Sequence, residues 1–261
     1  MGRKGRSRLR RLDAEVARRY PDLDDAAEAI RRGDVLVGGR ANTNPASLVR
    51  TDASIGRRRS TPLRGEVKLR AALDVLHVDV AGRTALDVGA AAGGFTRALL
   101  EAGARRVYAV DAGFGQLLGS LRQDERVVNL EGVNVASLTR ELVPEPIDLV
   151  SIDLSYLSLG KAVPQLEGVT LRADADMVAL VKPMFELGLA APPTGSADLA
   201  RAVERARAAL ARANWHPLTG TESPARGSRG AIEFFVHARR VERSSPLSTA
   251  EPAGALERRP P

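Results

Sequence analysis

Residues 84–100, TALDVGAAAGGFTRALL, decide the fold of this chain. A short apolar run carries an acid, Asp87, near its end and leads into a loop of Gly and Ala at residues 89–94. The chain then becomes compatible with a helix at Phe95. This pattern predicts a strand, a tight glycine turn and a helix amino terminus, which is how α/β proteins hold a nucleotide-like ligand.

The spacing of the loop points to one kind of ligand. It reads D-x-G-x-x-x-G-G rather than the G-x-G-x-x-G of dinucleotide sites. An acid beside the loop suits a cationic amino group or hydroxyls, so S-adenosylmethionine fits better than a pyrophosphate. The alternative is an ordinary turn whose small residues only allow close packing. The cofactor-binding residues expected here are Asp87, Gly89, Ala90, Ala91, Gly93, Gly94, Phe95 and Thr96.

Composition excludes several classes of site. The 261 residues include no cysteine, which excludes disulfides and cysteine nucleophiles. The three histidines are scattered along the chain, so we expect no metal site. No apolar run approaches the roughly 20 residues of a membrane span. The basic amino-terminal segment also lacks the apolar stretch of a signal peptide. We expect a cytoplasmic protein without membrane binding, either a monomer or a weak dimer.

Positive charge is concentrated in the first part of the chain. Residues 1–70 hold 18 Lys and Arg against 9 Asp and Glu, whereas the other residues hold 21 against 23. A basic segment on a near-neutral body predicts binding to a polyanion, above all a nucleic acid. A solvated arginine-rich face or a membrane surface are the alternatives. The candidate RNA-binding residues are Arg10, Arg11, Arg31, Arg32, Arg57, Arg58, Arg59 and Arg64.

Residues 9–56 have the pattern of a small α+β module. Two short amphipathic helices are separated at Pro21, and Val35–Val37 reads as a strand before a Gly-Gly turn that starts a small hairpin. This order resembles the RNA-binding module first seen in ribosomal small-subunit protein four. Residues 57–66 have the composition of a linker, and residues 241–261 are expected to be disordered.

Residues 67–240 alternate between strand and helix patterns. Helices are expected at 67–78 and 196–214, and strands at 85–88, 107–110, 127–130, 147–152, 177–181, 216–221 and 231–238. The last two read as a closing hairpin. This predicts a Rossmann-like α/β fold, with a seven-stranded, mostly parallel sheet, helices on both faces and one antiparallel strand late in the order.

Polar side chains fall at the ends of four successive predicted strands. They are Asp87, Asp111, Asn134 and Asp153. Ligands of such sheets lie beyond the carboxyl ends of the strands, and Asp111 comes 24 residues after Asp87, near the spacing at which an acid reaches ribose hydroxyls. Each is compatible with a loop cap, but together they predict S-adenosylmethionine binding and add Asp111, Asn134 and Asp153 to the cofactor set.

Lysine is rare in this chain, and one lysine closes the fifth strand. Only four of the 39 basic residues are lysines: Lys4, Lys68, Lys161 and Lys182. A buried ammonium can lose its proton near neutral pH, whereas arginine cannot. Lys182, in VALVKPMFE, lies beside the predicted substrate cleft and is therefore expected to act in catalysis. The alternative is a lysine that only pairs with Asp153 or Glu186.

Several motifs together resemble one family. DVGAAAGGFTRALL, DAGFGQL, SIDLSYLSL, VKPMFE and IEFF are similar to the TlyA, or hemolysin-A-named, family of ribosomal RNA 2′-O-methyltransferases over about residues 9–240. That family joins the same RNA-binding module to an FtsJ-like catalytic domain. The resemblance implies a catalytic set around the target ribose, formed here by Lys68, Asp153, Lys182 and Glu233. It also implies ribosomal RNA or ribosomal subunits as partner.

The leading hypothesis is 2′-O-methylation of a cytidine ribose in ribosomal RNA, with Lys182 as general base. One alternative is a methyltransferase of the same fold that acts on transfer RNA or a small molecule, although the basic first 70 residues argue against a small molecule. Another is a non-catalytic RNA-binding protein, against which the complete catalytic set argues. Membrane lysis is suggested only by the family's name.

Overall fold

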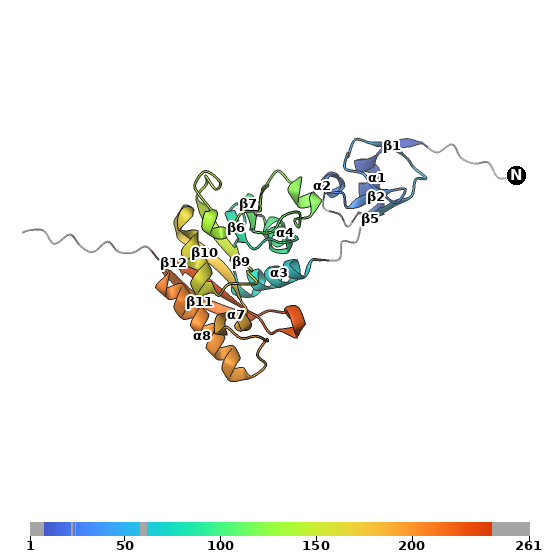
Figure 1. The fold of residues 1–261 in the computed structure, drawn as a ribbon. Helices are drawn as coiled ribbons and strands as arrows, with labels where there is room; N and C mark the ends of the chain where they lie inside the picture. The colour runs from blue at the N-terminus through green and yellow to red at the C-terminus, as the bar shows by residue number, and fades with distance from the viewer. Residues whose placement is uncertain (1–7, 22, 24, 58–61, 242–261) are drawn as a thin grey trace, which may run out of the picture.

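The fold is built around a seven-stranded sheet in the order β11–β12–β10–β9–β6–β7–β8 (Figure 1). The computed structural model describes residues 8–21, 23, 25–57 and 62–241. Paired strands of this sheet are parallel except β12, which runs antiparallel to both neighbours. The predicted α/β class and the late antiparallel strand are therefore confirmed. The strands are β6 Thr84–Val88, β7 Arg106–Asp111, β8 Val127–Glu131, β9 Ile147–Ile152, β10 Leu171–Val181, β11 Trp215–Glu222 and β12 Phe234–Arg240.

Two strands start more than one residue away from the expected position. β10 begins six residues early, because Leu171 already pairs with Ile147 of β9 before the register shifts at Asp176. Of the residues in between, Arg172, Ala173 and Asp174 are exposed, so no run of large apolar side chains marks this part of the strand. β12 begins at Phe234 rather than 231, because the preceding residues form a loop that contains the short helix η3, Ser228–Gly230.

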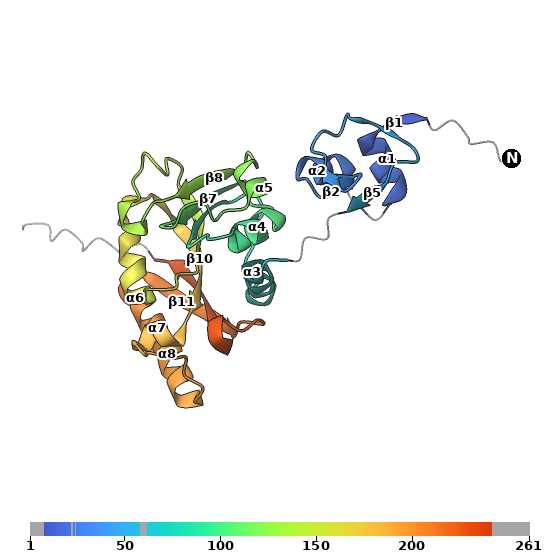
Figure 2. The ribbon, with the colours of Figure 1, turned by 45° about the vertical axis from the view of Figure 1, so that its right-hand side comes forward.

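Helices cover both faces of the sheet, as predicted. Figure 2 shows α3 and α4 on one side and α6 and α8 on the other. Leu69, Leu73 and Leu99 pack in the core of the first face, while Leu166 and Leu210 pack in the core of the second. The helices here are α3 Arg64–Leu76, α4 Gly94–Glu101, α5 Gly119–Arg122, η1 Val135–Ser137, α6 Leu159–Ala162, η2 Val163–Gly168, α7 Pro183–Leu187 and α8 Ser196–Arg212.

The helix expected from residue 67 begins three residues earlier. The Glu66 carboxylate accepts a hydrogen bond from the Leu63 amide at 3.1 Å, which satisfies an otherwise free donor at the helix start. The first turn of α3 packs closely on α4, since a Cβ atom on Gly94 would lie only 2.9 Å from the Gly65 Cα. This contact fixes α3 beside the glycine loop and places Lys68 near the sheet.

The amino-terminal module has its own small core, formed by Leu12, Val16, Ile30, Val35 and neighbouring apolar residues. The two helices and the β2–β3 hairpin are confirmed, whereas strands β1, β4 and β5 were not anticipated. Its elements are β1 Leu9–Arg11, α1 Leu12–Arg19, α2 Ala26–Arg31, β2 Val35–Val37, β3 Arg40–Ala41, β4 Leu48–Arg50 and β5 Ile55–Arg57. They form two sheets, β1–β4 and β3–β2–β5.

A buried carboxylate organises arginines of the module. Glu15 is completely buried and contacts Arg10, Arg18 and Arg19. Its hydrogen bond from Arg18 is the main cause that lowers the pKa of Glu15 to about 2, so it stays ionised. Arg19 also donates to the Thr51 and Ala53 carbonyls, which ties α1 to the segment before β5.

Some sequence predictions fall outside the described residues. The tail expected to be disordered does so except for Val241, and so does the centre of the expected linker. The boundaries at 9–56, 57–66 and 67–240 therefore stay predictions. Within the described ranges, no helix combines the length and the apolarity that crossing a bilayer requires.

Candidate active site

The glycine loop lies where the strand order reverses, between β6 and β9. Gly89 follows β6 with φ of +92°, and a Cβ atom there would lie 2.4 Å from the Asp153 carbonyl oxygen. The Asp153 amide in turn donates to the Val88 carbonyl at 2.9 Å. Only glycine allows this close approach of the two chain segments. The loop therefore holds the carboxyl ends of β6 and β9 together at the expected ligand position.

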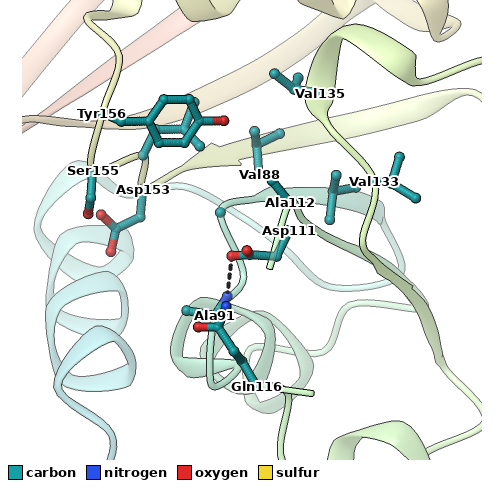
Figure 3. Close-up of a pocket in the computed structure, with 13 residues that line it drawn as sticks. Val88, Ala91, Asp111, Ala112, Gln116, Val133, Val135, Asp153, Ser155 and Tyr156 are labelled. Carbon is teal, nitrogen blue, oxygen red and sulfur yellow. Dashed lines mark hydrogen bonds between the residues drawn. The ribbon is translucent and has the colours of Figure 1, made fainter. Parts of the chain in front are cut away.

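A cavity of about 210 Å³ opens beyond these strand ends (Figure 3). Valine side chains form its apolar wall, and the Asp111 carboxylate faces it from the end of β7. Asp111 accepts hydrogen bonds from the Ala91 amide at 2.9 Å and the Gly113 amide at 2.7 Å. A carboxylate has about four acceptor positions, so it retains capacity for two hydroxyls. An apolar wall for a base and an acid for ribose hydroxyls fit the predicted nucleoside ligand.

Four of the predicted cofactor residues line this cavity, and the other seven do not. The lining residues are Gly89, Ala91, Asp111 and Asp153; the others are Asp87, Ala90, Gly93, Gly94, Phe95, Thr96 and Asn134. Gly94 packs on α3, and the Phe95 ring lies 5.9 Å from the ring of Phe235. Asn134 accepts from the Ala136 amide at 3.1 Å and so caps η1. Cofactor roles for these residues stay predictions.

Asp87 faces the interior of the protein rather than the cavity. Its side chain is completely buried and accepts hydrogen bonds from Thr96 Oγ1 at 2.7 Å and Ser151 Oγ at 2.9 Å. Burial raises the pKa of Asp87 to about 6, although the two hydroxyls partly oppose that effect. Asp87 therefore ties β6 to α4 and β9, and in this arrangement it would influence a ligand through the loop.

This burial predicts a pH-dependent contribution of Asp87 to stability. The unfolded chain releases the proton near the ordinary pKa of about 3.9, while the native protein keeps it to about pH 6. The free energy of unfolding from this group therefore decreases as the pH rises between these values. Asp87→Asn removes the titration. In urea unfolding, the free energy of unfolding of Asp87→Asn minus that of the wild type should therefore increase by about 2 kcal/mol from pH 4 to pH 7. A difference that does not change with pH would contradict the assignment.

A second cavity, of about 250 Å³, lies next to the first. Lys182 directly follows β10 and Glu233 directly precedes β12, and both line it. The register pairs Val181 with Phe234, which places these two side chains at neighbouring strand ends. The remaining wall combines apolar and polar side chains, among them Met184, Phe185, Pro193, Ile232, Ser155 and Arg229.

The predicted catalytic set forms two ion pairs. Lys182 Nζ lies 2.6 Å from Asp153 Oδ1, at the place where the two cavities adjoin. Lys68 Nζ lies 2.5 Å from Glu233 Oε2, and both of these side chains are buried. Lys68 lines neither cavity and sits behind Glu233. The structure thus brings all four residues together, with only Lys182 offering an amine to the second cavity.

Sequence reasoning missed several residues of the two cavities. Val133 and Val135 line the first cavity on either side of Asn134. Ser155 lies two residues after Asp153, and its hydroxyl accepts a hydrogen bond from Lys182 Nζ at 2.8 Å. All three lie within two residues of a polar residue that was predicted at a strand end. Extending each strand-end search by two residues would have found them.

Four of the eight candidate RNA-binding arginines already contact carboxylates of the module. Arg10, Arg11, Arg31 and Arg32 pair with Glu15, Asp13, Glu28 and Asp34, respectively. The Arg57 guanidinium lies 5.5 Å from the centre of the Tyr20 ring, and Arg64 opens α3. Arg58 and Arg59 lie outside the described residues. RNA contacts by these arginines stay predictions.

A comparison with known protein families decides the class of this site. The FtsJ-like methyltransferase family matches residues 62–240, which include both cavities and all four residues of the catalytic set. The chain belongs to this family. A methyltransferase needs a donor site next to an acceptor site, and two cavities of this chain adjoin each other within the matched residues. The predicted cofactor, S-adenosylmethionine, is confirmed by this membership.

Relatives of this FtsJ-like protein include the TlyA group. The 16S/23S rRNA (cytidine-2′-O)-methyltransferase TlyA of Mycobacterium tuberculosis is 40% identical, and the match covers 88% of this chain and 90% of the relative. Hemolysin A of Brachyspira hyodysenteriae is 30% identical, with 81% and 91% covered. A solved structure from Streptococcus thermophilus, described as a hemolysin, superposes with a TM-score of 0.66 and is 29% identical. The match covers 90% of this chain and 89% of that one. The resemblance to the TlyA family is confirmed.

Proposed function

We propose that this protein transfers a methyl group from S-adenosylmethionine to the 2′-hydroxyl of a cytidine ribose in ribosomal RNA, with Lys182 as general base. The observation that carries the proposal is the position of Lys182, beside Asp153 and between a nucleoside-type cavity and a second cavity. The name of the Mycobacterium tuberculosis relative, which specifies cytidine 2′-O-methylation of rRNA, supports the choice of acceptor.

Gly89, Ala91 and Asp111 would hold the cofactor in the first cavity. When bound, S-adenosylmethionine supplies a methyl group on a sulfonium, so the acceptor oxygen needs alignment above all. A ribose hydroxyl is a poor nucleophile until its proton begins to leave, and Lys182 Nζ would accept that proton. Asp153 keeps this amine at the junction of the cavities.

Glu233 and Lys68 would act beside the acceptor. Because Lys68 neutralises Glu233, this second carboxylate adds little charge near Lys182. The pair also joins α3 to the start of β12, which fixes one wall of the acceptor cavity. We therefore assign Lys182 to proton transfer and the pair to positioning.

The choice of RNA is tested by offering several acceptors. Purified protein and labelled S-adenosylmethionine are incubated separately with 30S subunits, 50S subunits, transfer RNA and protein-free rRNA. We expect incorporation into ribosomal RNA, alone or within subunits. Incorporation into transfer RNA only would overturn the proposed acceptor while leaving the methyltransferase assignment intact.

The arginines of α2 provide a test of the module's role. Arg31 and Arg32 are exposed, and their ion-pair partners Glu28 and Asp34 are partly exposed, so replacing both arginines with Ala should leave the module folded. Each phosphate contact that is lost reduces the slope of log affinity against log salt by about 0.7 to 1. We expect weaker RNA binding and a reduction of about 1 to 2 in this slope, measured by fluorescence anisotropy.

The control for that experiment changes net charge equally on another element. Arg201 and Arg212 lie exposed on α8, and Arg201 likewise pairs with a partly exposed carboxylate, Asp198. The Arg201→Ala, Arg212→Ala protein should bind RNA with the salt dependence of the wild type. Equal losses in both double variants would mean that only total charge matters and would contradict an RNA-binding role of α2.

A further inference from the structure

Ser155 occupies the junction between the two cavities. Of the residues that the structure describes, it alone lines both of them. It follows Asp153 by two positions in the loop after β9, and Figure 3 shows its side chain beside that of Asp153. Its hydroxyl accepts a hydrogen bond from Lys182 Nζ at 2.8 Å. Ser155 is not among the site residues predicted from the sequence.

The two partners of Lys182 hold its amine in different ways. Asp153 Oδ1 lies 2.6 Å from Nζ in an ion pair, and within the described residues this oxygen forms no hydrogen bond. The contact with Ser155 Oγ has hydrogen-bond geometry. Coulomb attraction varies little with direction, whereas a hydrogen bond depends strongly on it. Asp153 therefore attracts the amine, and Ser155 fixes the direction in which it points.

We propose that Ser155 is a positioning residue for methyl transfer, which orients Lys182 Nζ toward the acceptor oxygen; this rests on the proposed function above. A neutral Nζ that donates one N–H to Ser155 directs its lone pair away from that bond. Because Lys182 lines the second cavity, the lone pair is then available to an acceptor bound there. The 2′-hydroxyl proton moves to Nζ while the oxygen bonds to the methyl carbon. The carbon–sulfur bond breaks, and its electron pair stays on sulfur.

The charges that face Lys182 allow the contribution of Ser155 to be isolated. Asp153 is the ion-pair partner of the amine, and Glu233 and Arg229 line the same cavity. Glu233 is already paired with Lys68. None of these charges changes in Ser155→Ala. Loss of the hydroxyl removes one acceptor that favours the ammonium form, so the amine should lose its proton at a lower pH.

The test combines kinetics with a measurement on the amine itself. In Ser155→Ala we expect kcat to fall about tenfold, with KM for RNA and Kd for S-adenosylmethionine unchanged. The acidic limb of the kcat–pH profile, where the general base loses its proton, should shift to lower pH, and Ser155→Thr should restore both kcat and this limb. Isotope labelling of lysine side-chain nitrogens gives few signals, because the chain has four lysines. The Lys182 signal, assigned with Lys182→Arg, should titrate at a lower pH in Ser155→Ala.

Ser158→Ala is the matched control. Ser158 lies in the same loop, lines neither cavity and gives its helix no side-chain cap, so this variant should behave like the wild type. An unchanged Lys182 titration in Ser155→Ala would overturn the positioning role even if the wild type methylates RNA. Wild-type protein that methylates no RNA would instead overturn the proposed function, whatever the amine titration gives.

Discussion

Replacing Lys182 with Ala should lower the methyl-transfer rate by a factor of about 10² to 10⁴, the range that loss of a general base produces. Binding of S-adenosylmethionine, measured by calorimetry, should stay unchanged, because Lys182 lines the second cavity and the proposed donor site is the first. The loss should appear in kcat measured with saturating RNA. This combination separates a role in proton transfer from a role in donor binding.

Lys182→Arg distinguishes a base from a positive charge. Arginine keeps the charge and can still pair with Asp153, which lies 2.6 Å from the lysine amine. It remains protonated in proteins, so it cannot accept the proton from the hydroxyl. We expect this variant to be as inactive as Lys182→Ala. Activity close to that of the wild type would show that charge is sufficient and would contradict the base assignment.

Gly89→Ala should disrupt the donor site and the folded state together. Its new Cβ atom would lie 2.4 Å from the Asp153 carbonyl oxygen, so β6 and β9 must separate at their carboxyl ends. Overpacking of this kind costs about 1–3 kcal/mol, and the positive φ adds about 1–2 kcal/mol. Because Gly89 and Asp153 both line the first cavity, affinity for S-adenosylmethionine should fall roughly 10- to 100-fold in calorimetry.

Gly82→Ala is the control for the backbone conformation alone. Gly82 has a similar φ of +72°, but a Cβ atom there would meet nothing within 4 Å. It precedes β6, at the end of the strand opposite the cavities. This variant should lose stability through φ but bind S-adenosylmethionine normally. Normal binding by Gly89→Ala as well would show that close packing against Asp153 is not required for the donor site.

The succession of strands and helices along residues 67–240 was predictable because the central strands of the large sheet are buried apolar runs separated by helical patterns. Strands β1 and β4 of the module were not. Each has only three residues, and Leu9 pairs with Arg50, far along the chain. Short exposed strands carry too few side chains to show a two-residue period. Their existence depends on long-range pairing that local sequence does not encode.

The site likewise contains residues that the sequence predicted and features that it did not. Asp111, Asp153 and Lys182 were found because parallel strands bring their carboxyl ends to one edge. The sequence did not predict the direction in which each side chain points. Asp87 points into the protein because Thr96 and Ser151 supply hydroxyls there. Ser155 was missed because a loop after a strand has no period from which its orientation can be read.

Nucleoside analysis of the methylated RNA is the most direct test of ribose 2′-O-methylation. Ribosomal RNA lacking the modification is incubated with the wild-type protein and labelled S-adenosylmethionine, digested to nucleosides and examined by mass spectrometry. We predict label in 2′-O-methylcytidine, and its absence after reaction with Lys182→Arg. Label in a ring-methylated nucleoside, or no label in any RNA, would contradict the account.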